Sequence, residues 1–236
     1  MTHMYSSGEY LEATGQTWHT EDSPWKASQI FRMISTNDLH PKRIAEIGCG
    51  AGRILDELSK QPCLADVQFE GYDPSPHAIE LCRKIDNKKC SFSCSDLFTE
   101  ENSPQYFDIL LVIDVVEHVP DYMGFLEKCR TKADYKIYHV PLDIHVSSVL
   151  RNAFIRGRYS VGHLHYFTAD SALATLRDTG HEILDYFYTS GSLGLFKQHP
   201  SINTALANGP RWLFSKVSVP FTARVLGGYS LLVLAK

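Results

Sequence analysis

The sequence has little of several features that mark particular classes of protein. None of its six cysteines stands in a Cys-x-x-Cys pair and several fall in apolar segments, which indicates reduced core thiols rather than disulfides. No apolar run approaches the length of a membrane span, and the first residues lack the basic end and apolar stretch of a signal peptide. The net charge of −4 comes without a basic stripe, which argues against a nucleic-acid surface. We therefore expect a cytoplasmic protein with a small-molecule partner.

Length and composition indicate one domain. A chain of 236 residues can bury the core of one α/β domain, whereas two complete domains would be cramped. A hydrophobic share of 44% with 21% charged residues is typical of a globular protein. We expect a single domain over 1–236, in which 1–24 form an N-terminal arm and 141–162 and 189–228 are variable insertions.

The segment 44–55 organises the rest of the chain, because it reads as a strand that turns into a helix through three alternate glycines, which begin with Gly48 and Gly50. Such a turn lets the backbone approach a ligand closely and directs free amides of the helix start toward it. Arg53 stands where the last glycine of a dinucleotide-binding turn would fall, which disfavours a nicotinamide dehydrogenase. Glu46 would face a cationic or hydroxylated ligand and would repel phosphate.

Strand-like segments recur along the chain. Helix-like segments separate the first five of them, which predicts a parallel sheet with helices on both faces. The segment 107–113 is apolar throughout, as expected of a central strand covered on both sides. We expect the last two strands to pair antiparallel. The predicted strands cover 44–47, 67–73, 90–94, 107–113, 135–140, 183–188 and 229–234.

Short polar residues mark where helices should begin. Ser23 and Ser75 are predicted N-caps, and each is followed by a proline suited to the first helical position. Thr168 is predicted to cap a later helix that ends at Gly180.

Acidic residues stand at the predicted carboxyl ends of successive strands. Asp73 follows Gly48 by 25 residues, where an acid in a doubly wound sheet can bind both hydroxyls of a ribose. Asp96 is placed to accept a hydrogen bond from the exocyclic amine of an adenine that lies over Leu97. The alternative for Asp73 is a solvated turn residue, because Asp-Pro is common in turns.

With these segments in order, the chain resembles the class I S-adenosylmethionine-dependent methyltransferases. The nearest subfamily is that of small-molecule enzymes, which includes the ubiquinone-pathway O-methyltransferases. The resemblance extends roughly over 25–190 and implies an α/β, Rossmann-like, seven-stranded, mostly parallel sheet whose last strand is antiparallel. It rests on four motifs in order, at 46–52, 72–75, 95–97 and 114–119.

The resemblance also implies a cofactor and its site. The cofactor would be S-adenosylmethionine, with S-adenosylhomocysteine as the product. Its sulfonium and ammonium charges suit a pocket that holds Glu46 and Asp114. The residues implied to bind it are Glu46, Gly48, Gly50, Asp73, Pro74, Asp96, Leu97, Asp114 and Val115.

Histidines supply the candidates for a general base. His118 directly follows Glu117 after the fourth strand, and an imidazole titrates near the working pH. Its alternative role is structural, with the ring bonded to a backbone carbonyl. His163 and His165 would share one face of a strand-like segment, and we retain His165 as the second catalytic candidate.

We predict an enzyme that methylates a small molecule at oxygen, and we assign no metal ligand. One alternative is a cofactor-binding regulatory protein without catalysis. Another is a divalent-metal-assisted methyltransferase that acts on an RNA or sugar hydroxyl, as in the small-RNA 3′-end methyltransferases. The chain's matching ligands would be Asp114, Glu117 and His118, with His139, His145 or His165 as the distant partner.

The two insertions are the regions in which an acceptor would be selected. Gly and Pro break 189–228 into pieces, which favours two short helices packed on the domain, with a lid, a dimer contact or a membrane-touching surface as alternatives. We expect a monomer or a homodimer. Arg151, Arg156 and Arg158 are candidates to hold an anionic acceptor, unless they belong to a solvated loop. Seven residues of the second insertion are expected to be too apolar to stay exposed: Trp212, Leu213, Phe214, Val217, Phe221, Val225 and Leu226.

Overall fold

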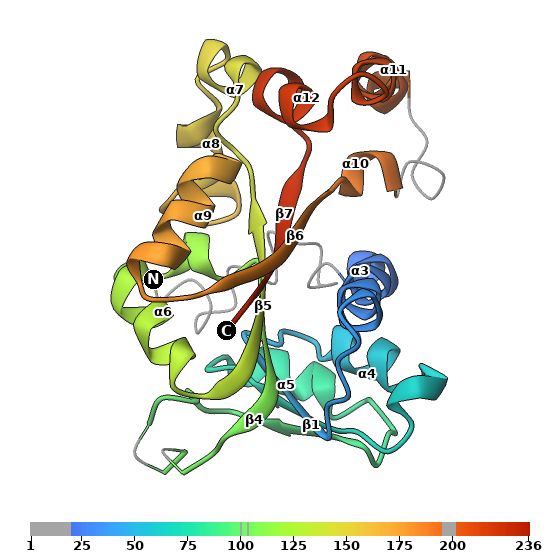
Figure 1. The fold of residues 1–236 in the computed structure, drawn as a ribbon, viewed down its shortest axis with the longest axis vertical. Coiled ribbons are helices and arrows are strands. Elements are labelled where there is room, and N and C mark those ends of the chain that lie inside the picture. Colours follow the sequence, from blue (N-terminus) through green and yellow to red (C-terminus); the bar gives the residue numbers. More distant parts are fainter. Residues whose placement is uncertain (1–19, 100, 103, 195–201) are drawn as a thin grey trace.

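A seven-stranded sheet forms the centre of the protein (Figure 1). The computed structural model describes residues 20–99, 101–102, 104–194 and 202–236. The strand order is β3-β2-β1-β4-β5-β7-β6, in which β7 runs antiparallel to both neighbours and the other pairs are parallel. This confirms the predicted fold class. The strands are β1 (Arg43–Ile47), β2 (Gln68–Tyr72), β3 (Cys90–Ser93), β4 (Phe107–Ile113), β5 (Ala133–Pro141), β6 (Ile183–Thr189) and β7 (Ser230–Ala235).

Helices connect the strands and cover the sheet. The predicted arm lies outside the described residues as far as residue 19, and its last residues form a 3₁₀ turn and the start of a helix. The 3₁₀ turns are η1 (Thr20–Asp22), η2 (Pro62–Leu64) and η3 (Val116–His118). The α-helices are α3 (Ser23–Thr36), α4 (Arg53–Ser59), α5 (Pro76–Cys82), α6 (Tyr122–Arg130), α7 (Val146–Leu150), α8 (Ala153–Ser160), α9 (Ala169–Asp178), α10 (Gly191–Gly194), α11 (Ile202–Ser215) and α12 (Val219–Leu226).

Strand β4 explains why the core has two halves. Leu110 and Val112 belong to one apolar cluster together with residues of α6 and α9. Ile109 and Leu111 belong to a second cluster on the opposite face, with residues of α3 and α4. The ribbon shows α6 and α9 on one side of the sheet and α3 and α4 on the other (Figure 1). A strand covered on both faces has no solvent side, so its sequence does not alternate.

The predicted helix starts are right at two of three positions. Ser75 accepts a hydrogen bond from the amide of Ala78, and Thr168 and Ser171 form a reciprocal capping box. Ser23 is wrong as an N-cap, because the N-cap is Asp22 and Ser23 already lies within α3. The reason is that η1 runs directly into α3. The backbone before Ser23 is therefore helical rather than extended, as an N-cap requires.

The thiols are reduced, as predicted. All six cysteines are free, and Cys49, Cys82 and Cys129 are buried. Cys63 and Cys94 are exposed, so the expectation of core thiols fails for these two.

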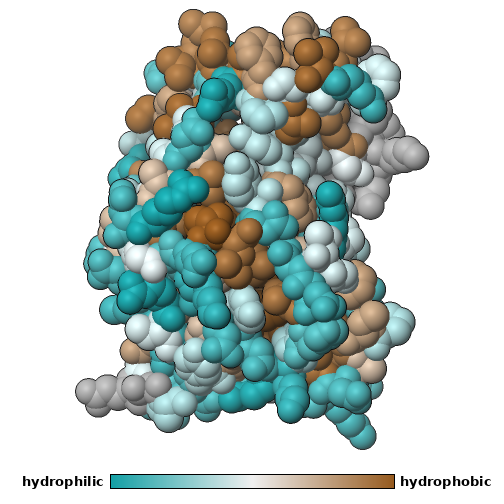
Figure 2. Space-filling model, viewed as in Figure 1, coloured by the Kyte–Doolittle hydropathy of each residue, from teal (hydrophilic) through white to brown (hydrophobic). Residues whose placement is uncertain are grey.

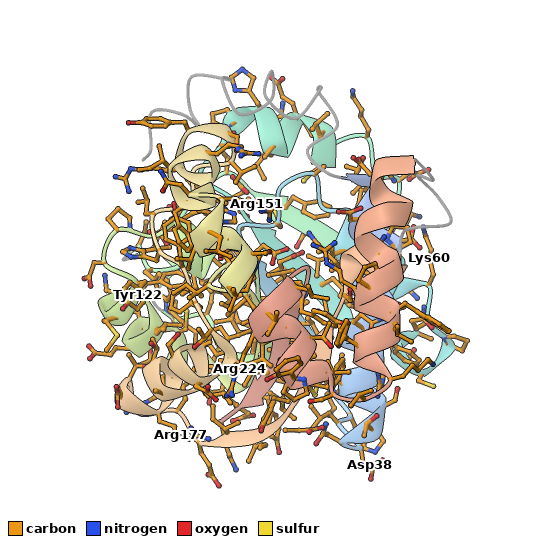
Figure 3. All side chains as sticks on the ribbon, turned by 90° about the horizontal axis from the view of Figure 1, so that it is seen from above. Asp38, Lys60, Tyr122, Arg151, Arg177 and Arg224 are labelled. Atoms are coloured by element: carbon orange, nitrogen blue, oxygen red, sulfur yellow. The ribbon has the colours of Figure 1, made fainter. Side chains whose placement is uncertain are left out.

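The insertions form a cap beyond the carboxyl ends of the strands. Helices α7, α8, α11 and α12 lie at the end of the molecule to which β5 leads, and from above they lie over the sheet (Figures 1 and 3). The described part of 189–228 contains three helices where two were predicted. Arg151 is exposed and bonds the Ser147 carbonyl on its own helix.

Several apolar side chains of this cap face solvent, contrary to expectation. Figure 2 shows the apolar surface at the end occupied by α7, α11 and α12. The exposure has a simple cause: α12 turns a narrow stripe around Thr222 and Ala223 inward, and no layer of described residues lies above its outer face. Among the described residues, no helix is both long and apolar enough to cross a bilayer. The exposed members of the predicted set are Trp212, Leu213, Phe214, Val217 and Phe221, while Val225 and Leu226 are half-buried.

The buried β4 strand yields a stability prediction. Replacing Leu110, which has no exposed surface, by Ala should lower the free energy of unfolding by about 2–5 kcal/mol, because a cavity remains where the side chain packed. Leu150→Ala is the matched control, since Leu150 is 81% exposed and its loss should change stability by less than about 0.5 kcal/mol. Urea denaturation measures both, and equal effects would contradict the two-sided core.

Candidate functional site

One cavity lies at the carboxyl edge of the sheet. It has a volume of about 350 Å³ and is bounded by the ends of β1, β4 and β5 and by the start of α3. The glycine turn after β1 lines one part of it. The other part is lined by Glu117, His118 and His163. Gly48 and His118, which are 70 residues apart in the sequence, therefore line the same cavity.

The glycine turn has the left-handed backbone that only glycine adopts without strain. Gly48, Gly50 and Gly52 have φ values of +69°, +52° and +70°. A Cβ atom at Gly48 would lie 2.7 Å from Cγ2 of Val115. The predicted residue Val115 thus does not line the cavity, but its methyl group packs directly against the turn.

Asp73 holds this turn in place. Its Oδ2 atom accepts the Gly50 amide at 3.0 Å, and its Oδ1 atom accepts the Ser75 amide at 2.8 Å. Burial raises the pKa of Asp73, and these two amides oppose that shift. Asp73 and the exposed Pro74 do not line the cavity, so their contact with a ribose stays a prediction.

The structure does not bring Asp96 and Leu97 to the cavity. Asp96 is exposed and its Oδ1 atom accepts the Phe98 amide at 2.9 Å, in a turn that directs the carboxylate back to its own backbone. Leu97 is fully buried in the apolar core. Both residues were predicted near an adenine because they follow a strand. A position after a strand does not reveal how the next turn folds, and here the turn directs both side chains away from the cavity.

Asp114 is the centre of a polar network at the mouth of β4. Its carboxylate contacts Lys26 Nζ at 2.8 Å and His139 Nδ1 at 2.6 Å, and His139 Nε2 lies 2.9 Å from the hydroxyl of Thr189. Burial alone would raise the pKa of Asp114, but His139 and Lys26 outweigh it and hold the pKa well below its usual range. Lys26 comes from α3, before the sheet begins, so no strand-end pattern in the sequence pointed to it.

Glu46 is a buried acid on the cavity wall. Its side chain is 1% exposed, and Oε2 has no hydrogen-bond partner among the described residues. Burial, and then Cys82, raise its pKa well above the usual value, and the opposing effect of Lys26 is smaller. A cationic ligand group beside Glu46 would offset the cost of this desolvated carboxyl.

His118 is a cavity residue, and His165 is not. His118 Nδ1 lies 3.0 Å from the Gly162 carbonyl, so this nitrogen donates and Nε2 carries the lone pair. The structural role considered for His118 is therefore real, although the residue also lines the cavity. Burial lowers the pKa of His118 to about 4, so the ring is neutral at pH 7. His165 instead bonds the Pro120 carbonyl at 3.2 Å.

His163 and Glu117 complete this end of the cavity. Glu117 was named only as a ligand in the metal-assisted alternative, and His163 only as the neighbour of the chosen candidate His165. His163 Nδ1 is 2.7 Å from Asp143 Oδ2. The alternation of His163 and His165 was visible in the sequence, but it gave both the same face. The backbone decides between them, because the Glu117 carbonyl accepts the amides of Leu164 and His165 and thereby fixes the loop.

The strand order, the antiparallel β7 and the glycine turn together define a Rossmann-like α/β fold with its ligand cavity at the carboxyl edge of the sheet. A family model described as a methyltransferase domain matches residues 19–186. The chain belongs to this methyltransferase family, which confirms the resemblance seen in the four motifs.

Curated relatives are similar over a shorter stretch. The ubiquinone biosynthesis O-methyltransferase of Bradyrhizobium diazoefficiens is 36% identical over 99 residues, which are 40% of this chain and 37% of that protein. The enzyme of the same name from Aliivibrio fischeri strain MJ11 is 29% identical over 105 residues, or 42% of each chain. The matches thus span about two fifths of these relatives.

Solved structures share the whole fold. The magnesium protoporphyrin IX methyltransferase of Synechocystis PCC 6803, which contains bound S-adenosylhomocysteine, has a TM-score of 0.63 at 14% identity, covering 99% of this chain and 95% of its own. The plantazolicin methyltransferase BpumL, in complex with a monoazolic desmethylPZN analogue and S-adenosylhomocysteine, has a TM-score of 0.57 at 19% identity, and the match covers 97% of this chain and 87% of that one. At these identities the likeness shows the fold alone.

The left-handed turn gives a test with opposite signs at two glycines. Gly48→Ala should lower the free energy of unfolding by about 1–3 kcal/mol, because the new Cβ meets Val115 and the residue keeps a positive φ. Gly157→Ala in α8 should raise it by about 0.5–1 kcal/mol, since the new atom would meet only Tyr166, at an ordinary contact distance of 3.8 Å, and Ala favours the helix. Thermal and urea unfolding measure both, and a stabilising Gly48→Ala would reject the strained turn.

The buried Glu46 gives a pH-dependent test on the ligand-free protein. The folded state holds the Glu46 proton at a pH where the unfolded chain has released it, so stability falls as pH rises above the unfolded value of about 4.5. Glu46→Gln removes this loss, and its gain over the original chain should be larger at pH 8 than at pH 5. Asp114→Asn should instead reduce stability equally at both values, because the Asp114 pKa lies below both in the folded and the unfolded chain. Urea denaturation at pH 5 and pH 8 measures these differences. If Glu46→Gln changed the free energy of unfolding equally at both pH values, the raised pKa of Glu46 would be contradicted.

Proposed function

We propose that the protein is an S-adenosylmethionine-dependent methyltransferase that transfers a methyl group to a hydroxyl oxygen of a small molecule. The observation that carries this proposal is the single cavity with Glu46 and the glycine turn on one side and Glu117, His118 and His163 on the other. The family supports methyl transfer, and the relatives named ubiquinone biosynthesis O-methyltransferase support oxygen as the methylated atom.

The residues on the glycine side fit the cofactor. Glu46 presents a buried carboxyl oxygen without a partner among the described residues, which suits the cofactor's ammonium or sulfonium charge. Gly48, Gly50 and Asp114 line the same hollow. When bound, the cofactor supplies an electrophilic methyl group on a positively charged sulfur. Asp73, Pro74, Asp96 and Leu97 remain our predicted residues for the adenosyl side, and Val115 remains our predicted residue for the methionine end.

The residues on the histidine side would receive the acceptor. A hydroxyl must lose its proton to become a good nucleophile, and a neutral imidazole that faces it can promote this loss. His118 lines the cavity, and we assign to it the activation of the acceptor hydroxyl. We do not assign this role to His165, whose Nε2 contacts the Pro120 carbonyl instead. The protein's further task is to hold the nucleophile and the methyl group in line.

The class of acceptor follows from size and charge. A cavity of about 350 Å³ that must also receive part of a cofactor suits a small molecule or the end of a larger one. The net charge of −4 supports an acceptor other than nucleic acid. A cytoplasmic monomer or homodimer remains our expectation.

The assignment of His118 is tested by separating binding from turnover. His118→Ala should leave the affinity for S-adenosylhomocysteine, measured by calorimetry, unchanged. The turnover rate is measured as release of S-adenosylhomocysteine with an acceptor that the original chain methylates, chosen from a panel of phenols, catechols and hydroxy acids. His118→Ala should lower this rate by about 100-fold or more. His165→Gln is the matched control and should retain the rate. Asp73→Ala should abolish cofactor binding, because it releases the Gly50 amide and the turn.

The outcomes divide the alternatives. An unchanged rate in His118→Ala would remove this residue from the reaction. Binding of S-adenosylhomocysteine without release of product with any acceptor of the panel would favour a regulatory protein over an enzyme.

A further inference from the structure

We propose that Glu117 and His163 bind a protonated amino group of the methyl acceptor, so that the acceptor is a small hydroxylated amine. Both residues line the part of the cavity that we assign to the acceptor. The proposal deepens the proposed function and rests on it for the place of the cofactor, although a preference for a charged amino group can be measured by binding alone.

The buried carboxyl group of Glu117 is the first reason for this inference. Its side chain is 1% exposed, it lines the cavity, and neither oxygen has a hydrogen-bond partner among the described residues. The 3₁₀ turn η3 places it there, and its backbone carbonyl accepts the amides of Leu164 and His165. A buried carboxyl group without hydrogen bonds is costly, and a ligand that donates them would offset this cost.

The charges around Glu117 favour a cation over a neutral donor. Burial raises the pKa of Glu117 well above its usual value, Asp114 and Asp143 add to this shift, and the opposing effect of Lys26 is smaller. Lys26 contacts the Asp114 carboxylate at 2.8 Å. A positive ligand group beside Glu117 would favour the ionised carboxylate and would be held by its charge.

His163 supplies a second hydrogen-bond acceptor beside Glu117. Its Nδ1 atom lies 2.7 Å from the Asp143 carboxylate, so Nδ1 donates and Nε2 carries the lone pair. Nε2 lies 4.0 Å from Glu117 Oε1, which is too far for a hydrogen bond between the two. An ammonium group has several N–H donors with bonds of about 2.8–3.0 Å, so one such group can donate to both atoms. The pair therefore suits a primary or secondary ammonium.

The amino group belongs to the acceptor rather than to the cofactor. In the proposed function the positive charges of the cofactor are assigned to Glu46, on the glycine side of the same cavity. Glu117 directly precedes His118, to which we assign activation of the acceptor hydroxyl, so a group bound to Glu117 lies close to that hydroxyl. A second cation near the sulfonium would be repelled in an uncharged pocket, and the Glu117 carboxylate offsets this repulsion.

Three phenols of similar size test the charge preference of this site. At pH 7, 2-(aminomethyl)phenol is a cation, 2-(hydroxymethyl)phenol is neutral and 2-hydroxybenzoate is an anion. Each is titrated into the full chain with and without S-adenosylhomocysteine, and ligand NMR measures the dissociation constant. The amine should bind about 10-fold or more tightly than the neutral phenol, as expected for hydrogen bonds between charged groups, and the anion should bind most weakly.

Two variants remove the two hydrogen-bond acceptors separately. Glu117→Gln should abolish the preference for the amine while changing the affinity for the neutral phenol by less than about 3-fold. His163→Leu should reduce the preference by about 3-fold or more, because one hydrogen bond to the amine is lost. Glu127→Gln is the matched control, since it removes the same charge from an exposed position on α6, and it should keep the full preference.

Equal binding of the amine and the neutral phenol by the original chain would overturn the proposal, because Glu117 would then offer no charge to the ligand. Absence of binding by the amine would overturn it as well. A preference that survives in Glu117→Gln would assign the amine to another group. The comparison within the original chain needs no variant, and circular dichroism verifies that each variant folds.

The same measurements separate the two proposals. If S-adenosylhomocysteine binds and the amine is not preferred, the amino-group site is rejected while the proposed function stands. If S-adenosylhomocysteine does not bind and the chain alone prefers the amine, the proposed function fails and the amino-group site stands.

Discussion

Desolvation of acids at one edge of a parallel sheet is the constraint on which this site depends. Parallel strands end at the same edge, so Glu46, near the end of β1, and Asp114, which follows β4, are brought to one hollow together with Glu117. Burial raises the pKa of an acid unless a cation accompanies it. Lys26 and His139 accompany Asp114, whereas Glu46 and Glu117 retain strongly raised pKa values. The cavity is thus partly neutralised by the protein and favours positive charge from a ligand.

Much of the fold could be predicted because its signals are local. The uninterrupted apolar run of β4 indicated a central strand, and Ser75 and Thr168 were identified as caps by their own chemistry. The errors arise where a neighbour in space decides the outcome. Ser23 looks like a cap, but η1 makes the preceding backbone helical. The apolar residues of the cap, such as Trp212, suggested burial, yet no layer of described residues covers them.

The site was predictable to the extent that it follows strand ends. The glycine turn, Glu46, Asp114 and His118 all line the cavity as expected. Lys26 was not predicted, because a helix that precedes the sheet brings it in. The choice of His163 over His165 depends on two hydrogen bonds to the Glu117 carbonyl, a contact between distant segments that alternation alone cannot reveal.

The position of β7 has a consequence for how the sheet is completed. Strand β6 pairs with β7 and with no other described strand, and β7 is the last described strand to be synthesised. While the ribosome still holds residues 230–235, the segment 183–189 has no strand beside it and the edge of β5 is bare. A nascent chain therefore has two strands, β5 and β6, that each lack a neighbour, and the pairing of residues 230–235 with both completes the sheet. Loss of that segment would cost the sheet two strands rather than one.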